Sequence, residues 1–175
     1  MKIALMAYAR SGKDEIYSII RGTSKEEVGR LAFGDALRGY AHKITDVKLE
    51  PKPRWLYEQF GKAMRDIDPE VWVKQLEKTY QQELQNGIKN FVITDLRQPN
   101  EYKWAKENGF TIVFVECDES IRKERSQGDT NWVAINPSET DMADQVPDFV
   151  IWNEGSLDEL IFTTKFLLKE VGSNE

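Results

Sequence analysis

The sequence of 175 residues contains one cysteine, Cys117, and one histidine, His42. A single thiol excludes an intramolecular disulfide, and a single imidazole excludes a metal site built from several histidines or from a cysteine–histidine cluster. Such sparing use of cysteine is typical of a protein that works in the reducing cytoplasm.

Long apolar runs are also missing. The longest run near the C-terminus, 160–168, contains a lysine and two threonines and is far shorter than the ~20 apolar residues of a membrane span. The apolar start at 3–7 passes into polar residues without a cleavage-like site, which favours a buried strand over a signal peptide. We therefore expect a soluble protein without a membrane partner.

Positive charge is not in excess, because 24 Lys and Arg face 30 Asp and Glu and give a net charge of −6. A broad nucleic-acid surface needs clustered cations, so we expect no nucleic-acid partner, although local basic pockets remain open. The 40% hydrophobic and 31% charged residues are ordinary for a folded chain, and the length fits a single domain.

Short apolar runs rich in β-branched and aromatic residues predict strands at 3–7, 28–33, 91–94, 111–115 and 149–152. Segments with helical spacing lie at 14–20, 35–44, 55–65, 69–84, 100–107, 119–126 and 157–171. Pro69 suits the first turn of its helix. This alternation predicts an α/β fold, a three-layer sandwich in which helices flank a five-stranded, mainly parallel sheet. Ligands of such sheets bind beyond the carboxyl ends of the strands, which makes the residues after each strand site candidates.

The segment 7–14, A-Y-A-R-S-G-K-D, lies between the first strand and the first helix. It resembles the phosphate loop G-x-x-x-x-G-K-[ST], whose backbone N–H groups surround phosphate oxygens at a helix N-terminus while the lysine reaches the terminal phosphates. Gly12 and Lys13 fill these roles, whereas Ala7 replaces the first glycine. The predicted ATP-binding loop consists of Ala9, Arg10, Ser11, Gly12, Lys13 and Asp14.

Asp14 stands where such loops carry a hydroxyl. A carboxylate is repelled by phosphates unless a cation lies between them, so Asp14 predicts Mg²⁺, held directly or through water. The alternative is that Ser11 and Gly12 form an ordinary turn and that Asp14 caps the helix.

The S-G-K-D variant at 11–14 resembles the loop of phage-type deoxynucleoside monophosphate kinases and also that of animal phosphomevalonate kinases. Further segments resemble the deoxynucleotide kinases specifically, namely 33–38, 54–68, Trp72, 94–101, 138–140 and 149–157. The resemblance implies a single P-loop kinase domain over 1–175, with an acceptor-binding helical segment at about 38–86 and a lid-like segment at about 119–146.

The same resemblance implies transfer of the γ-phosphoryl group of ATP to a deoxynucleoside monophosphate. Mg²⁺ would be the only cofactor and small nucleotides the partners, and a homodimer is one option for the assembly. Two alternatives stay open. One is a kinase of another small phosphate ester, such as phosphomevalonate or dephospho-coenzyme A, and the other is an ATP sensor that transfers no phosphate.

Asp95 and Arg97 alternate at the end of the third strand, which suits a carboxylate near Mg²⁺ and a guanidinium that grips phosphate. The resemblance makes Asp95 a carboxylate close to the metal or a base-like group, and Arg97 a ligand of the acceptor phosphate. The alternative is a structural ion pair or a turn. Glu101 is expected to cap the following helix.

Arginines can bind a monophosphate through two parallel hydrogen bonds, and Arg38, Arg54 and Arg65 are candidates for this role. The resemblance favours Arg38 and Arg65 and adds Asp35 to the acceptor site. The alternatives are local ion pairs, of Arg38 with Asp35 and of Arg65 with a neighbouring aspartate at 66 or 68.

Among the aromatic residues, Tyr57 is the candidate for stacking on the acceptor base. Core packing is expected for Trp55, Phe60, Trp72 and Tyr80, and a surface or packing role for His42.

Arg122 and Arg125 lie one helical turn apart and are predicted to act as catalytic residues with Lys13 and Asp95, projecting toward a bound triphosphate. A local pair with Asp118 is the alternative for Arg122. By resemblance, Asn153 and Gly155 line the adenine pocket of ATP, and a helix-entry turn is the alternative.

Overall fold

The computed structural model describes residues 1–48, 50, 52–127 and 144–172. Its strands are β1 (Lys2–Ala7), β2 (Val28–Leu31), β3 (Asn90–Leu96), β4 (Thr111–Glu116) and β5 (Phe149–Trp152). Its helices are α1 (Lys13–Thr23), α2 (Phe33–Ile44), α3 (Arg54–Ile67), α4 (Val71–Gln85), α5 (Pro99–Glu107), α6 (Glu119–Arg125) and α7 (Leu157–Gly172). All predicted elements are present, which confirms the α/β class. No helix within these residues is long and apolar enough to cross a lipid bilayer.

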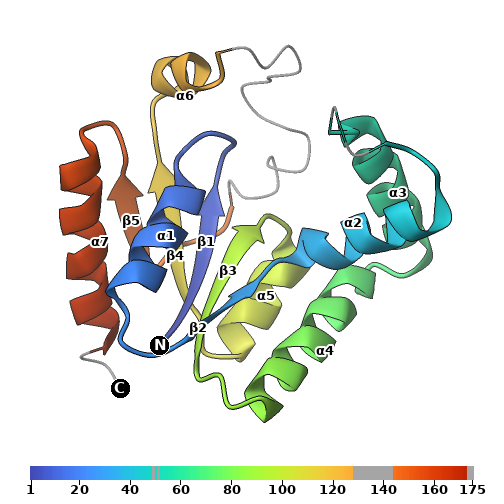
Figure 1. Cartoon of the computed structure of the whole chain (residues 1–175), viewed down its shortest axis with the longest axis horizontal. Coiled ribbons are helices and arrows are strands. Elements are labelled where there is room, and N and C mark those ends of the chain that lie inside the picture. The colour runs from blue at the N-terminus through green and yellow to red at the C-terminus, as the bar shows by residue number, and fades with distance from the viewer. Residues whose placement is uncertain (49, 51, 128–143, 173–175) are drawn as a thin grey trace.

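The strands form one parallel sheet in the order β2-β3-β1-β4-β5. The central strand is β1, where Ile3 lies opposite Val92 of β3 and Thr111 of β4. The chain adds strands first on one side of β1 and then on the other. Ligands of open parallel sheets bind at the carboxyl end of the strand where this direction reverses. Figure 1 shows the loop after β1 and helix α6 at this edge of the sheet.

Alternate residues of each strand are buried on opposite faces of the sheet. Ile3 and Leu5 pack with residues of α1 and α7, whereas Ala4 and Met6 pack with residues of α4 and α5. All four side chains are at most 2% exposed. The sheet is therefore covered on both faces, as a parallel sheet requires, and the three layers are visible in Figure 1.

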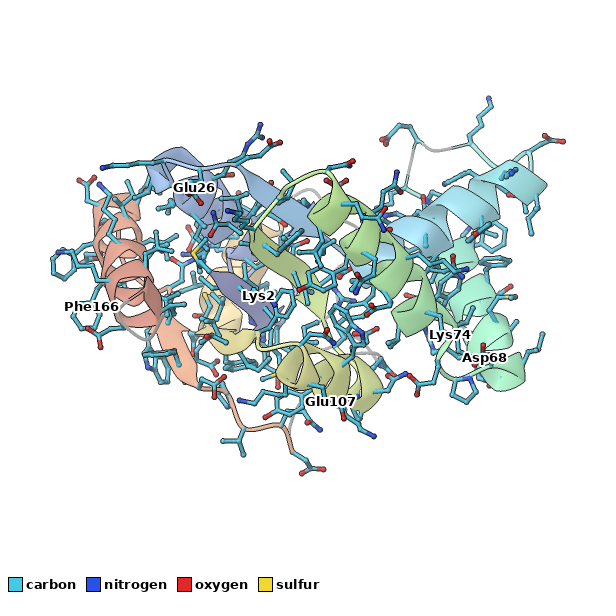
Figure 2. The ribbon with its side chains drawn as sticks, turned by 90° about the horizontal axis from the view of Figure 1, so that it is seen from below. Lys2, Glu26, Asp68, Lys74, Glu107 and Phe166 are labelled. Atoms are coloured by element: carbon cyan, nitrogen blue, oxygen red, sulfur yellow. The ribbon has the colours of Figure 1, made fainter. Side chains whose placement is uncertain are left out.

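Lys2 is the first residue of β1 and lies at the end of the sheet where the strands begin (Figure 2). Its ammonium donates a hydrogen bond to the carbonyl of Asn108 at 3.0 Å and lies 5.5 Å from the ring centre of Tyr80 and 5.9 Å from that of Phe110. A cation over aromatic rings contributes roughly 0.5–2 kcal/mol. This edge is used for packing, opposite the edge that carries the predicted site.

Helix α2 begins two residues earlier than predicted, because Phe33 belongs to the helix and not to the second strand. The carboxylate of Asp95, at the end of β3, accepts hydrogen bonds from the N–H groups of Phe33 at 2.8 Å and Gly34 at 2.9 Å. These are two of the four N–H groups that a helix leaves unpaired at its start. The cap comes from 61 residues away in the sequence, so local patterns could not indicate it.

The turn between α3 and α4 also corrects a prediction, because Pro69 precedes α4 instead of lying in its first turn. Asp68 forms the turn by accepting the N–H of Glu70 at 3.1 Å. Its other carboxylate oxygen accepts a hydrogen bond of 2.7 Å from the ammonium of Lys74, and Figure 2 shows the two side chains together. This hydrogen bond lowers the pKa of Asp68.

Glu101 caps helix α5, as the sequence predicts. Its carboxyl group accepts the N–H groups of Arg97 at 2.8 Å and Gln98 at 3.1 Å. The residue is only 6% exposed. Burial, and next the negative charge of Asp95, raise the pKa of Glu101 to about 8. The carboxyl group of Glu101 is therefore largely neutral at pH 7 in the folded protein.

The variant Glu101→Gln keeps the shape of the neutral carboxyl group and removes its titration. Because the pKa of Glu101 is higher in the folded protein, the bound proton stabilises the fold. This stabilisation is fully present below the pKa of the unfolded chain and is lost as the pH rises to about 8. Relative to Glu101→Gln, the parent protein should lose stability from pH ~5 to pH ~8, by up to ~1.4 kcal/mol per pH unit. Urea unfolding of both proteins across this range measures the difference. A difference that is constant with pH would show that Glu101 does not gain a proton on folding.

Candidate active site

The segment after β1 forms a tight loop that leads directly into α1. Arg10 and Gly12 have left-handed backbone conformations, with φ of 66° and 93°. The N–H of Ser11 donates to the carbonyl of Tyr8 at 3.3 Å, which closes the turn. Left-handed residues before a helix turn successive N–H groups toward one point, the arrangement that binds phosphate oxygens in phosphate loops.

Gly12 is required at its position for a second reason besides its φ. A Cβ atom there would lie 2.1 Å from Nδ2 of Asn153, far inside contact distance. Asn153 is the residue after β5, is 7% exposed, and donates from Nδ2 to the carbonyl of Ser11 at 2.8 Å. The hydroxyl of Ser11 is fully buried and has no hydrogen-bond partner among the described residues. Buried unpaired polar groups are rare and cluster at functional sites.

Lys13 and Asp14 differ in exposure, although both lie in the first turn of α1. The side chain of Lys13 is 17% exposed, that of Asp14 is 86% exposed, and Nζ of Lys13 lies 4.0 Å from Oδ2 of Asp14. The residue that caps α1 is Gly12, without a side-chain hydrogen bond. Asp14 therefore does not occupy the capping position of α1, and its exposed carboxylate lies beside the ammonium of Lys13.

Asp95 and Arg97, at the end of β3, make different contacts. Both carboxylate oxygens of Asp95 bind the start of α2, and each oxygen retains a second lone pair. The backbone N–H of Arg97 donates to the carboxyl group of Glu101. This hydrogen bond fixes the turn from which the guanidinium of Arg97 extends. No group of three or more metal-binding side chains occurs within the described ranges. A metal here would have few protein ligands, the usual arrangement when Mg²⁺ is held by one or two carboxylates and substrate phosphates.

Asp35 and Arg38 form the local ion pair that the sequence left as an alternative. Nη2 of Arg38 donates to Oδ1 of Asp35, and Nη1 of Arg30 donates to Oδ2 of the same carboxylate at 2.7 Å. The guanidinium of Arg38 also lies against Gly34, where a Cβ atom would be 2.8 Å from its Nη1 and 3.1 Å from Oδ2 of Asp95. Asp35 thus holds Arg38 beside the carboxyl end of β3.

Cations from separate segments converge close to this point. The ammonium of Lys52 lies within electrostatic reach of Arg38, Arg54, Arg97 and Lys13. Partial removal from water, and next the repulsion by these charges, lowers the pKa of Lys52, although much of the surface of this residue is exposed. We call these five residues the cation cluster. Sequence reasoning missed Lys52, whose only signal was its place beside Arg54, across Pro53.

Two acceptor-site candidates lie on α3. The hydroxyl of Tyr57 forms a 2.6 Å hydrogen bond with Nε2 of His42, which links α3 to α2. Arg65 is half-buried beside Gly61. It forms neither of its predicted local pairs, because Asp66 is paired with Lys62 and Asp68 with Lys74, each at 2.7 Å.

The aromatic predictions hold in part. Trp72 and Tyr80 are buried, at 4% and 3% exposed, as expected for core residues, whereas Trp55 is 55% exposed and does not pack in the core.

The arginines of α6 contact the residues that flank the phosphate loop. Arg122 is 4% exposed, donates from Nε to the carbonyl of Cys117 at 3.2 Å, and lies 5.1 Å from the ring centre of Tyr8. Arg125 donates from Nη2 to the carbonyl of Asn153 at 3.0 Å and from Nη1 to Sγ of Cys117 at 3.3 Å. Protein groups therefore hold both guanidinium groups close to the loop, and the predicted projection of both toward a bound triphosphate stays a prediction.

Gly155 lies in the turn that leads into α7. Such a helix-entry turn is the alternative to a place in the adenine pocket. A Cβ atom at this position would lie 1.9 Å from Oε2 of Glu159, which accepts the N–H of Ser156 at 2.7 Å. Of the predicted lid-like segment, α6 is described, whereas 128–143, including the family-like stretch 138–140, lie outside the described residues.

Several solved structures, two of them named as kinases, share this fold. TT1252 from Thermus thermophilus matches 97% of this chain and 97% of its own, with a TM-score of 0.62 and 18% identity. An APS kinase from Mycobacterium tuberculosis matches 96% of this chain and 98% of its own (TM-score 0.56, 13% identity). A deoxyadenosine kinase from M. mycoides matches 97% of this chain and 100% of its own (TM-score 0.53, 13% identity). The chain thus has the fold of these structures, and the predicted α/β sandwich with a five-stranded parallel sheet is confirmed.

Sequence comparison gives the family. The deoxynucleotide monophosphate kinase of Enterobacteria phage T4 is 28% identical over 151 residues, which are 83% of this chain and 55% of that protein. The chain therefore spans about half the length of this relative. The family profile "Deoxynucleotide monophosphate kinase" matches residues 54–164, more than half of the chain. By this match the protein belongs to the deoxynucleotide monophosphate kinase family.

Proposed function

We propose that the protein transfers the γ-phosphoryl group of ATP to a deoxynucleoside monophosphate, giving the diphosphate. The observation that carries the proposal is the cation cluster, in which Arg38, Arg54 and Arg97 on one side and Lys13 of the phosphate loop on the other all lie within electrostatic reach of Lys52. A kinase of this kind must hold two anions next to each other, and an ATP sensor needs only one anion site. Family membership supports the same substrate class.

The phosphate loop would hold the donor. Its N–H groups and the start of α1 present positive partial charge, and the poorly exposed ammonium of Lys13 adds a full charge. Asp14 would hold Mg²⁺ directly or through water, because its exposed carboxylate is the hard oxygen ligand that Mg²⁺ prefers. When bound, Mg²⁺ would neutralise charge that develops on the phosphate oxygens.

The acceptor would bind on the side of α2 and α3, the helical segment at about 38–86. Arg38 and Arg97 come from both sides of Asp95 and would grip the acceptor phosphate, joined by Lys52. Arg65 and Tyr57 on α3 would contact the outer part of the nucleotide, with the tyrosine hydroxyl oriented by His42. Asp35 contributes through Arg38, which it holds by an ion pair.

The transfer needs no covalent intermediate, because an oxygen of the acceptor phosphate can attack the γ-phosphorus of ATP in line with its bond to the bridging oxygen, which leaves with ADP. The protein supplies fixed positive charge around the transferred group. Asp95 lies between the two subsites with lone pairs to spare and would receive a hydrogen bond from water or from the acceptor. Arg122 and Arg125 would support the loop from beneath.

An acceptor screen tests the proposal against its rivals. Purified protein with ATP and Mg²⁺ is supplied with deoxynucleoside monophosphates, ribonucleoside monophosphates, phosphomevalonate or dephospho-coenzyme A, and ADP release is measured. We expect ADP release with at least one deoxynucleoside monophosphate. Turnover of a non-nucleotide ester alone would favour the rival kinase, and ATP binding without turnover of any acceptor would favour the sensor.

The variant Lys13→Ala should fold normally and lose most transfer activity, because it removes the full charge nearest the donor phosphates. Removing one such stabilising group from a preorganised site lowers kcat by about 10²–10³-fold. Steady-state ADP release measures the loss. Lys165→Ala, at an exposed position of α7, is the matched control. Turnover of Lys13→Ala close to that of the control would contradict the loop assignment.

The variant Asp14→Asn should raise the Mg²⁺ concentration needed for half-maximal activity, by roughly 10–100-fold. Asp14→Ser should retain activity, because it restores the hydroxyl that other phosphate loops use. Glu15→Gln removes a negative charge from the same helical turn and serves as the control. Equal magnesium titrations of Asp14→Asn and Glu15→Gln would exclude a metal-binding role for Asp14.

The variants Arg97→Lys and Arg65→Lys keep the charge and lose the planar pair of donors. Each lost charge-assisted hydrogen bond costs roughly 1.5–3 kcal/mol, so kcat/KM for the acceptor should fall about 10–100-fold. ATP binding should stay unchanged by calorimetry, and Arg21→Lys in the last turn of α1 is the control. Equal losses for ATP and acceptor would place these arginines on the donor side, and unchanged acceptor kinetics would make them structural.

A further inference from the structure

Asn153 is fixed by hydrogen bonds at its backbone and at its side chain. Its N–H donates to the carbonyl of Glu116 on β4 at 2.9 Å, and its carbonyl accepts Nη2 of Arg125 at 3.0 Å. The side-chain amide donates to the carbonyl of Ser11 at 2.8 Å, across 142 residues of sequence. With 7% of its surface exposed, the residue lies behind the phosphate loop and not in an open pocket.

The hydrogen bond to Ser11 determines the direction of a loop donor. In a trans peptide, the carbonyl oxygen of one residue and the N–H of the next point in opposite directions. The carbonyl of Ser11 points toward Asn153, so the N–H of Gly12 points away from Asn153. In a phosphate loop, the N–H groups before the helix are those that contact the donor phosphates.

The close approach of Gly12 and Asn153 makes this arrangement specific. Because a Cβ atom at Gly12 would lie 2.1 Å from Nδ2 of Asn153, the amide occupies the space that any other residue would need. The left-handed φ of 93° at Gly12 places its peptide in the required orientation. The glycine of the loop motif is thus matched to Asn153, the residue that follows β5.

Arg125 fixes Asn153 from the other direction. Its two terminal nitrogens bind the carbonyl of Asn153 and Sγ of Cys117, which joins the end of α6 to the ends of β4 and β5. Arg122 adds a contact one turn earlier, to the carbonyl of Cys117 and the ring of Tyr8. Helix α6 therefore contacts the segment 7–14 at Tyr8 and, through Asn153, at Ser11.

We propose that Asn153, held by Arg125, is a positioning residue that turns the N–H of Gly12 toward the donor phosphates. The inference rests on the proposed function, because it assumes that the loop binds the phosphates of a nucleoside triphosphate. It assigns to Asn153 a role toward the phosphates instead of the adenine ring.

The test is the variant Asn153→Leu, which is close to asparagine in shape and lacks the donor. An aspartate would be less informative, because its charge would itself repel phosphates. Asn108→Leu is the matched control, since Nδ2 of Asn108 also donates to a backbone carbonyl, that of Trp104, at 2.9 Å and at the opposite end of the sheet. Affinities for ATP and for inorganic triphosphate are measured by calorimetry with Mg²⁺ present, beside thermal unfolding of each variant.

We expect Asn153→Leu to bind ATP and inorganic triphosphate more weakly by the same factor, about tenfold or more, whereas Asn108→Leu binds both normally. A loss for ATP alone would show that Asn153 contacts the base, and no loss for either would show that the loop does not depend on it. Both results overturn the inference. If Asn153→Leu does not fold, Arg125→Lys, which breaks the paired contact to Asn153, must show an equal loss for both ligands.

Turnover separates this inference from the proposed function. If the parent protein binds inorganic triphosphate and Asn153→Leu weakens that binding, the positioning role holds even when no acceptor is phosphorylated. If the parent protein binds neither ATP nor triphosphate, the positioning role and the proposed function both fail.

Discussion

The hydrogen bonds of the Asp95 carboxylate are the interaction on which the geometry beside the phosphate loop depends. Asp95 lies near the end of β3 and accepts the first two N–H groups of α2, so the sheet and helix α2 meet at one side chain. The guanidinium of Arg38 lies against the same helix start. The charge of Asp95 also contributes to the raised pKa of Glu101, which fixes the turn that carries Arg97. Two buried or half-buried carboxyl groups thus place two arginines.

The cation cluster gathers like charges at a place where a bound anion would be favoured. Partial burial, and next the charges of Arg38, Arg54, Arg97 and Lys13, lower the pKa of Lys52. By linkage, an anion that binds there favours the protonated lysine and stabilises the fold. Such electrostatic repulsion is expected where a site is preorganised for charge that arrives with the substrate.

The sequence predicted the elements well, because buried parallel strands and amphipathic helices leave strong local patterns. It also indicated the phosphate loop, since Gly12 and Lys13 act through backbone geometry that the motif encodes. It failed where a residue depends on a distant partner. The start of α2 depends on Asp95, the contacts of Arg122 and Arg125 depend on Cys117 and Asn153, and the lowered pKa of Lys52 depends in part on charges from other segments. Amphipathic spacing placed Trp55 in the core, but the face of α3 that carries it is exposed.

Two glycines explain how polar side chains can lie so close to the backbone at the starts of α1 and α2. A Cβ atom at Gly12 would collide with the amide of Asn153, and one at Gly34 would come within 2.8 Å of the guanidinium of Arg38. The amide of Asn153 is buried and hydrogen-bonded, so a larger residue at Gly12 would strain the fold of the loop. At Gly34, a Cβ atom would also lie 3.1 Å from Oδ2 of Asp95, which caps α2, so a larger residue would crowd the cap and push Arg38 away from its ion pair with Asp35. The phosphate loop and the start of α2 are thus both shaped by a glycine that leaves room for a distant polar partner.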